Sequence, residues 1–82
     1  MLHMELNILL FASWAEALGA SAVALSLPDR ATVADVLAAV RARVGDRVLP
    51  TPMVAVNHRY APPSAVIRAG DEVAIIPPVA GG

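Results

Sequence analysis

Hydrophobic and polar positions alternate along the first part of the chain. Leu6, Ile8 and Leu10 fall on one side of an extended backbone, and the polar residues between them fall on the other. This period of two predicts a half-buried strand over residues 4–10. A second apolar run, at residues 22–27, has strand length and is closed by a proline. We expect the two strands to pair as an antiparallel hairpin.

The hydrophobic spacing changes to that of a helix in the middle of the chain. Thr32, with Asp35 three residues later, has the pattern of a capping box, and Gly45 stands where a helix commonly ends. Both signals predict a helix over residues 32–44. A short helical turn is also expected at residues 13–18, before a glycine. One apolar stripe follows the main helix, formed by Val33, Val36, Leu37, Val40 and Val44.

The last part of the chain predicts further strands separated by proline-rich loops. Apolar runs at residues 53–57 and 72–76 have strand length, whereas residues 48–52 contain two prolines and are expected to be irregular. A short additional strand between these two runs is the alternative. The predicted architecture is α+β, of the β-grasp type. It has a mixed sheet of four to five strands and one main helix packed across the sheet.

Composition excludes several classes of function. The chain has no cysteine, hence no disulfide, thiolate metal site or cysteine nucleophile, and its two histidines are too few for a zinc site. The net charge of -1 gives no basic footprint for nucleic acid. The longest uncharged stretch has 12 residues, too few to span a membrane. No positively charged region precedes the first apolar run. We therefore expect a cytoplasmic protein, with neither membrane nor nucleic acid as partner.

The segment after the last predicted strand has an unusual composition. Prolines favour an extended path, and small residues let a partner approach the backbone closely. Fully extended, six residues reach about 20 Å. We interpret residues 1–76 as the folded domain and 77–82 as an extended tail that probes a narrow pocket; a frayed terminus is the alternative. The tail reads Pro77-Pro78-Val79-Ala80-Gly81-Gly82.

Four segments together resemble the MoaD family, the small, sulfur-carrying subunits of molybdopterin synthase, which are ubiquitin-like proteins. They occur in the family's order and extend over nearly the whole chain. A Gly-Gly end alone is shared by every ubiquitin-like carrier, so the combination carries the resemblance. The segments are Leu-Phe-Ala-Ser-Trp-Ala-Glu at residues 10–16 with Leu-Gly at 18–19, Val-Ala-Val-Asn at 54–57, Gly-Asp-Glu-Val-Ala at 70–74, and the tail.

The resemblance implies a chemistry for the tail. An ATP-dependent, ubiquitin-activating-like adenylyltransferase (MoeB type) would join Gly82 to AMP, and a sulfur donor would convert it to a thiocarboxylate. Gly81 provides a narrow, flexible approach. The tail would then enter the large subunit of molybdopterin synthase (MoaE type), in a heterotetramer, and give sulfur to cyclic pyranopterin monophosphate. This chain would bind no cofactor and no metal, and ATP and Mg²⁺ would lie on the adenylating partner.

Residues beside the tail are candidates for the partner-binding surface. Phe11, Ile75 and Pro77 are the candidates for apolar docking, with core packing as the alternative for Phe11 and Ile75. We expect Trp14 at the interface, because it follows the first strand in a loop-like segment and tryptophan is enriched at interfaces. The tail residues Pro78, Val79 and Ala80 complete the predicted binding set.

Three other functions fit parts of the same sequence. A related carrier for thiamine synthesis or tRNA thiolation would have the same fold and a similar tail, although thiamine carriers usually lack the proline pair. A ubiquitin-like protein modifier would share the activation step. A β-grasp interaction module with an inert tail would need no activation at all.

Overall fold

The computed structural model describes residues 2–77, so the predictions for residues 78–82 lie outside the described residues. That segment comprises Pro78, Val79, Ala80, Gly81 and Gly82.

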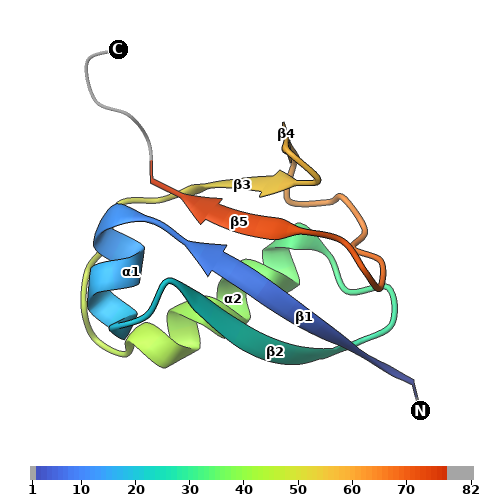
Figure 1. The fold of residues 1–82 in the computed structure, drawn as a ribbon, viewed down its shortest axis with the longest axis horizontal. Coiled ribbons are helices and arrows are strands. Elements are labelled where there is room, and N and C mark those ends of the chain that lie inside the picture. Colours follow the sequence, from blue (N-terminus) through green and yellow to red (C-terminus); the bar gives the residue numbers. More distant parts are fainter. Residues whose placement is uncertain (1, 78–82) are drawn as a thin grey trace.

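A five-stranded mixed sheet forms one layer, and two helices cover one of its faces (Figure 1). Strand order across the sheet is β2-β1-β5-β3-β4; β1 and β5 run parallel, and the other neighbours are antiparallel. This confirms the predicted β-grasp architecture, including the additional short strand. The elements are β1 (His3–Leu10), α1 (Ala12–Leu18), β2 (Ala22–Pro28), α2 (Val33–Val44), β3 (Met53–Val56), β4 (Arg59–Tyr60) and β5 (Val73–Ile76).

Successive side chains of the central strands point alternately to the core and to the open face of the sheet. Leu6, Ile8 and Leu10 of β1 are buried on the helix side, as their spacing predicts. In β5, Val73 and Ile75 point to the same side and have no exposed surface. The core therefore lies between the sheet and the helices, and every second residue of these strands faces away from it.

The main helix begins and ends where the sequence signals place it. The Thr32 side chain accepts a hydrogen bond from the Asp35 backbone N–H, and the Asp35 carboxylate accepts one from the Thr32 N–H. Gly45, with a positive φ of 76°, ends the helix. Val33, Val36 and Val40 then face the sheet as buried residues.

Trp14 was expected at the partner interface, and this expectation is wrong, although the helical turn predicted around it is present. Residues 12–18 form helix α1, and the Trp14 side chain is fully buried. Its indole N–H donates to the Pro50 carbonyl oxygen at 3.2 Å, which satisfies the one polar atom of the ring. The Arg41 guanidinium carbon lies 5.2 Å from the ring centroid, within cation–π range. The ring thus fills one end of the core and holds the irregular segment before β3 against it.

Replacing Trp14 with alanine should strongly destabilise the fold. The change removes the largest fully buried side chain, and such truncations cost about 3–5 kcal/mol. Urea denaturation followed by far-UV circular dichroism measures the free energy of unfolding. Phe11→Ala is the matched control, because Phe11 is 47% exposed and should lose far less. Equal losses in the two variants would contradict the core position of Trp14.

Candidate functional site

A row of four residues crosses the open face of the sheet at one level. Leu9 of β1 is paired with Ala74 of β5, Ala74 with Ala55 of β3, and Ala55 with Tyr60 of β4. Because two alanines occupy the middle of the row and larger side chains its ends, the sheet surface is hollow at its centre. The methyl side chains of the two alanines give this hollow an apolar floor.

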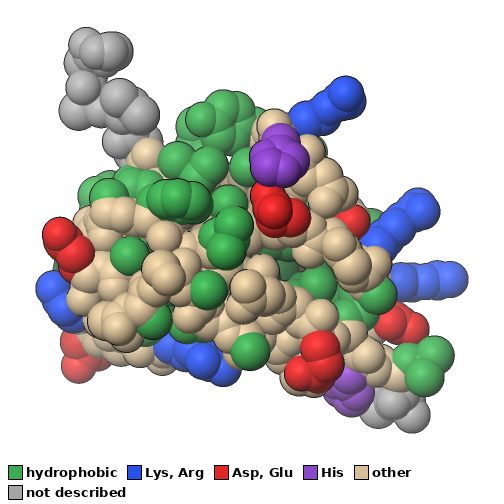
Figure 2. Space-filling view, in the orientation of Figure 1, with side chains coloured by type: hydrophobic (Ala, Val, Ile, Leu, Met, Phe, Trp, Pro, Cys, Tyr) green, Lys and Arg blue, Asp and Glu red, His purple; other side chains and the backbone are tan. Residues whose placement is uncertain are grey.

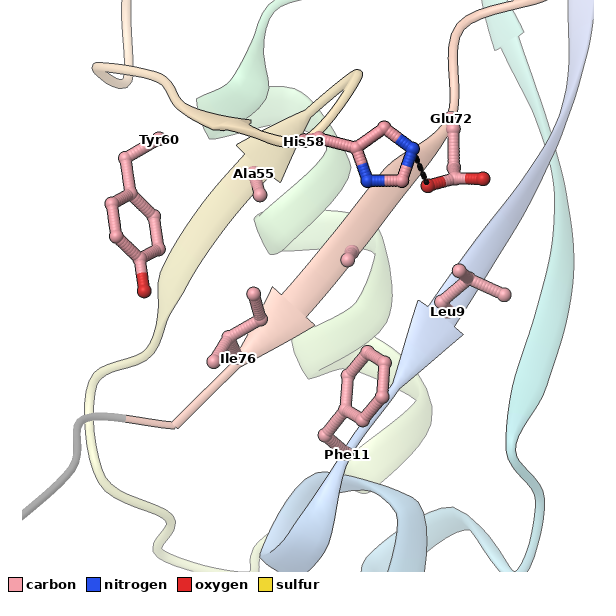
Figure 3. A pocket seen from close by; sticks show the side chains of 8 residues that line it. Leu9, Phe11, Ala55, His58, Tyr60, Glu72 and Ile76 are labelled. Carbon is pink, nitrogen blue, oxygen red and sulfur yellow. Dashed lines mark ion pairs between the residues drawn. The ribbon is translucent and has the colours of Figure 1, made fainter.

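Larger side chains surround this floor and make an apolar groove of about 480 Å³. Phe11 and Leu9 stand on one side of it, Tyr60 on the other, and Ile76 lies between them (Figure 3). Phe11 is 47% exposed and Tyr60 63% exposed, so both offer large aromatic surfaces to a partner. We call this set the open-face groove; its lining residues are Leu9, Phe11, Ala55, His58, Tyr60, Glu72, Ala74 and Ile76.

The open-face groove lies where the chain leaves the sheet. Ile76, which lines the groove, is the last residue of β5, and Pro77 follows it. Proline has no N–H for a sheet ladder, so strand pairing does not continue through Pro77. Figure 2 shows hydrophobic side chains gathered over β3 and β5 on this face. A partner bound there would therefore contact the domain next to the start of the tail.

A histidine–glutamate pair closes one end of the groove. The Nε2 atom of His58 lies 3.1 Å from the Glu72 carboxylate, and both side chains are largely exposed (Figure 3). Ion pairs in water contribute little to stability, typically about 0–1 kcal/mol. The pair therefore serves as a polar rim beside an apolar floor, an arrangement typical of protein interfaces.

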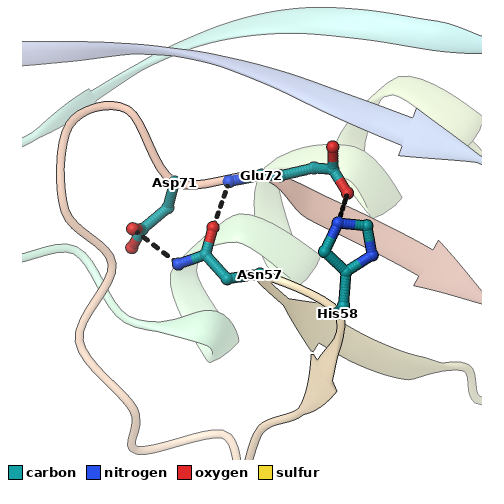
Figure 4. A network of polar contacts seen from close by, with 4 residues as sticks. All are labelled: Asn57, His58, Asp71 and Glu72. Atoms are coloured by element: carbon teal, nitrogen blue, oxygen red, sulfur yellow. Dashed lines mark hydrogen bonds and ion pairs between the residues drawn. The ribbon is translucent and has the colours of Figure 1, made fainter.

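The turn that carries His58 is held by the amide of Asn57. Asn57 donates from Nδ2 to the Asp71 carboxylate at 3.0 Å, and its Oδ1 accepts from the Glu72 N–H at 3.0 Å (Figure 4). Asn57 and His58 both have positive φ, 52° and 70°, which a tight hairpin turn between β3 and β4 requires. The network joins this turn to the start of β5 and so positions both partners of the rim pair.

The predicted docking residues have different positions. Phe11 lines the groove, and Pro77 is partly exposed beside it. Ile75 is fully buried in the core, so its assignment to the docking surface is wrong. The reason is the strand period: Ile75 shares the helix-facing side with Val73, and Ile76 takes the open face instead.

Several groove residues were not identified from the sequence. His58 and Tyr60 were given no role, and Ala55 and Ala74 carry no chemical signal. The sequence signal for this face was the alternation of side chains along each strand. It places Leu9 and Ile76 on the face of the sheet that the buried residues of their strands do not occupy. Which strands stand side by side is a tertiary property, so the row itself was not predictable from the sequence.

The described residues contain neither a metal-binding group nor a membrane-crossing helix. Among residues 2–77, no set of three or more His, Asp or Glu side chains is placed to hold a metal ion. In the same part of the chain, no helix has the length and apolar character needed to cross a membrane.

Comparisons with known proteins agree with this fold and extend the match through the tail. The model of the ThiS family matches residues 8–82. The molybdopterin synthase sulfur carrier subunit of Chlamydomonas reinhardtii is 37% identical and covers 96% of this chain and 100% of its own length. The Arabidopsis thaliana protein of the same name is 32% identical over 96% of this chain and 84% of its own. Among solved structures, the small archaeal modifier protein 1 of H. volcanii has a TM-score of 0.79 and 30% identity, over 93% of this chain and 99% of its own.

The sheet order and the structural similarity identify the chain as a ubiquitin-like β-grasp protein. The chain belongs to the ThiS family, and its resemblance to the molybdopterin synthase sulfur carrier subunits is confirmed by the two plant and algal relatives.

Two substitutions of Asn57 distinguish the contribution of its side-chain hydrogen bonds to stability from that of its positive φ. Asn57→Gly tolerates the positive φ but loses both side-chain bonds, and should lower the free energy of unfolding by about 1–2 kcal/mol. Asn57→Ala loses the same bonds and also strains the left-handed backbone, which should cost about 1 kcal/mol more. Urea denaturation of both variants measures the difference. Equal stability of Asn57→Ala and the unchanged protein would contradict the bracing role of Asn57.

Proposed function

We propose that this protein carries sulfur for molybdopterin synthesis as a thiocarboxylate on Gly82. One observation carries the proposal above all: a molybdopterin synthase sulfur carrier subunit aligns along its entire length with this chain. The family match also runs through Gly82, the residue that the proposal needs. The open-face groove supports it further, because an apolar surface beside the start of the tail suits a protein that presents its tail to partners.

The carboxylate of Gly82 needs activation before it can take sulfur. In the proposed sequence its oxygen attacks the α-phosphorus of ATP on an adenylating partner, and pyrophosphate leaves. A persulfide sulfur of a donor then attacks the acyl carbon, AMP leaves, and an acyl disulfide forms. A thiol cleaves that disulfide, leaving a thiocarboxylate on Gly82 and a disulfide between thiol and donor. ATP and Mg²⁺ belong to the partner's site, and this chain binds no cofactor in these steps.

The thiocarboxylate then acts as the nucleophile. Its sulfur displaces an oxygen substituent from a carbon of the pterin precursor, cyclic pyranopterin monophosphate, and that oxygen leaves with a proton. Water then hydrolyses the acyl carbon–sulfur bond of the resulting thioester, which leaves the sulfur on the pterin and releases Gly82 as a carboxylate. The protein is therefore a co-substrate that is recharged after each transfer. Gly81 has no side chain, so it lets the tail approach a confined site closely. Two transfers are needed for the two sulfurs of the dithiolene.

The open-face groove is the proposed docking surface for the adenylating enzyme and for the large synthase subunit. Binding energy at protein interfaces is concentrated in a few apolar and aromatic residues near the centre. Phe11 and Ile76 meet this description, since they line an apolar groove beside the tail. The resemblance implies a heterotetramer, with one carrier at each end of a dimer of large subunits.

Incubation with the adenylating enzyme, ATP and a sulfur source should change the intact mass. The expected increase equals replacement of one oxygen by one sulfur, and tandem mass spectrometry should place it on Gly82. A variant lacking Gly82 is the control and should also fail to support pterin sulfuration, while its circular dichroism stays unchanged. An unchanged mass with an enzyme that is active on another carrier would sink the proposal.

Charged substitutions in the groove should weaken docking without unfolding the domain. Phe11→Glu or Ile76→Glu puts a carboxylate on an apolar contact, and the affinity for the large subunit should fall at least about tenfold. Isothermal titration calorimetry measures this affinity. Val48→Glu is the matched control, because Val48 is 96% exposed and does not line the groove. Unchanged affinity in both groove variants would place the docking surface elsewhere.

A second candidate function is attachment to other proteins as a modifier. The structural similarity to the archaeal small modifier protein favours it, since activation of Gly82 would begin in the same way. The two functions differ in the group that reacts with the activated Gly82. A modifier would form an isopeptide bond between Gly82 and a lysine amine, whereas a sulfur carrier returns to the free carboxylate. Peptide mass spectrometry of conjugates therefore distinguishes them.

A further inference from the structure

Strand β2 leaves one complete edge of the sheet open. It stands at the outer end of the strand order and has seven residues, whereas β4 at the opposite end has two. An outer strand presents a row of backbone N–H and C=O groups that can pair with another extended chain. This edge lies on the far side of β1 from β5, away from the open-face groove.

Two hydrogen bonds decide which residues of β2 point outward. The Ser21 carbonyl oxygen accepts from the Leu10 N–H at 2.9 Å, and the Asp29 N–H donates to the Leu2 carbonyl oxygen at 3.2 Å. The backbone N–H and C=O groups of the odd-numbered residues of this strand therefore point toward β1. In an antiparallel ladder, the backbone groups of the residues between them point away from β1. The backbone groups of Ala22, Ala24 and Ser26 are thus directed outward.

The outer edge of β2 has few of the features by which natural edge strands prevent pairing with another chain. Its outward-facing residues have small side chains, and no charged residue occurs between residues 22 and 28. Pro28 ends the row, because it has no N–H to offer. About five residues of extended backbone are thereby open to pairing.

Arg43 of α2 is the side chain that reaches this edge. Its Nη2 atom donates to the outward carbonyl oxygen of Ala24 at 3.0 Å, in an exposed position. A carboxylate is a stronger partner for a guanidinium than a neutral carbonyl is, because it carries the opposite charge and can accept two parallel hydrogen bonds. Arg43 thus covers the middle of the edge by a contact that an acidic ligand can replace.

We propose that the outer edge of β2 binds an extended, acidic segment of a partner protein as an added strand. An incoming N–H takes the Ala24 carbonyl oxygen, and the released guanidinium of Arg43 pairs with a carboxylate of the same segment. Backbone bonds supply the affinity, as in other cases of strand addition, and Arg43 supplies the preference for acid. The site is independent of Gly82 chemistry and of the open-face groove.

A second copy of this chain is a poorer occupant. The sequence of β2 is Ala-Val-Ala-Leu-Ser-Leu-Pro, so pairing of β2 with itself brings no carboxylate from the added strand to Arg43. The arginine would lose its carbonyl contact and gain no ion pair from that strand. Charge complementarity therefore favours a different, acidic segment.

The test uses the full-length, ¹⁵N-labelled protein and a defined probe. The probe is a capped seven-residue peptide of alternating Val and Thr with a central Glu; the same peptide with Gln or Lys at the centre is the comparison. NMR titration should shift the amides of β2, and hydrogen exchange at Ala24 and Ser26 should slow by about tenfold or more at saturation. The Gln peptide should bind roughly twofold to fivefold more weakly.

Two pairs of variants test the mechanism. Ala24→Pro removes an outward N–H without removing a bond to β1, and should abolish binding, whereas Ala24→Val keeps the N–H and should bind. Arg43→Glu should reverse the preference to the Lys peptide, while Arg41→Glu on the other flank of α2 should keep the preference for Glu. Dispersion of the amide spectrum checks that each variant is folded.

Several results would overturn the proposal. Equal binding of the Glu, Gln and Lys peptides would remove the role of Arg43. Shifts confined to Phe11, Tyr60 and Ile76 would place the peptide in the open-face groove. A dimer in sedimentation experiments without peptide, abolished by Ala24→Pro, would make a second copy the occupant of the edge.

Discussion

The structure depends on the parallel pairing of β1 with β5, which joins the beginning of the domain to its end. Ile8 lies opposite Val73 and Leu10 opposite Ile75, and all four side chains are buried in the core. Between these pairs, Leu9 and Ala74 point to the other face and form part of the groove floor. One ladder therefore stabilises the core and builds the candidate site. Because β5 is the last strand, the same ladder also determines where the chain leaves the sheet.

The segment proposed to react follows this strand, so the proposed chemistry and the stability of the fold depend on different residues. The residues that hold the fold end at Ile75, and the residues proposed to react begin beyond Pro77. Changes in the tail should therefore leave the core intact, while the groove next to it gives partners a rigid surface to bind. The Asn57 network has a similar role on the other side, since it holds the β3–β4 turn to the start of β5. Together these contacts support the groove on rigid strands, whereas a loop would leave it free to move.

The two surfaces of the sheet differ in the partners that they suit. The open-face groove is apolar and offers aromatic side chains, so it fits a partner with its own apolar patch. The edge of β2 offers backbone groups and one arginine, so it fits an extended acidic chain. The two surfaces use different groups, because the groove is lined by side chains outside β2, whereas the open edge consists of outward backbone groups of β2.

Elements whose signals are local could be predicted from the amino-acid sequence. The alternation in β1, the Thr32–Asp35 capping box and Gly45 each act within a few residues, and all were read correctly. Trp14 was misplaced because its burial depends on the Pro50 carbonyl and the Arg41 guanidinium, which are distant in sequence. Ile75 and Ile76 are chemically identical, and only the direction of the β5 pleat assigns one to the core and the other to the groove. The tail motif could be identified from the sequence because its six residues are consecutive, whereas the groove required tertiary structure, since its floor comes from four strands brought side by side by pairing.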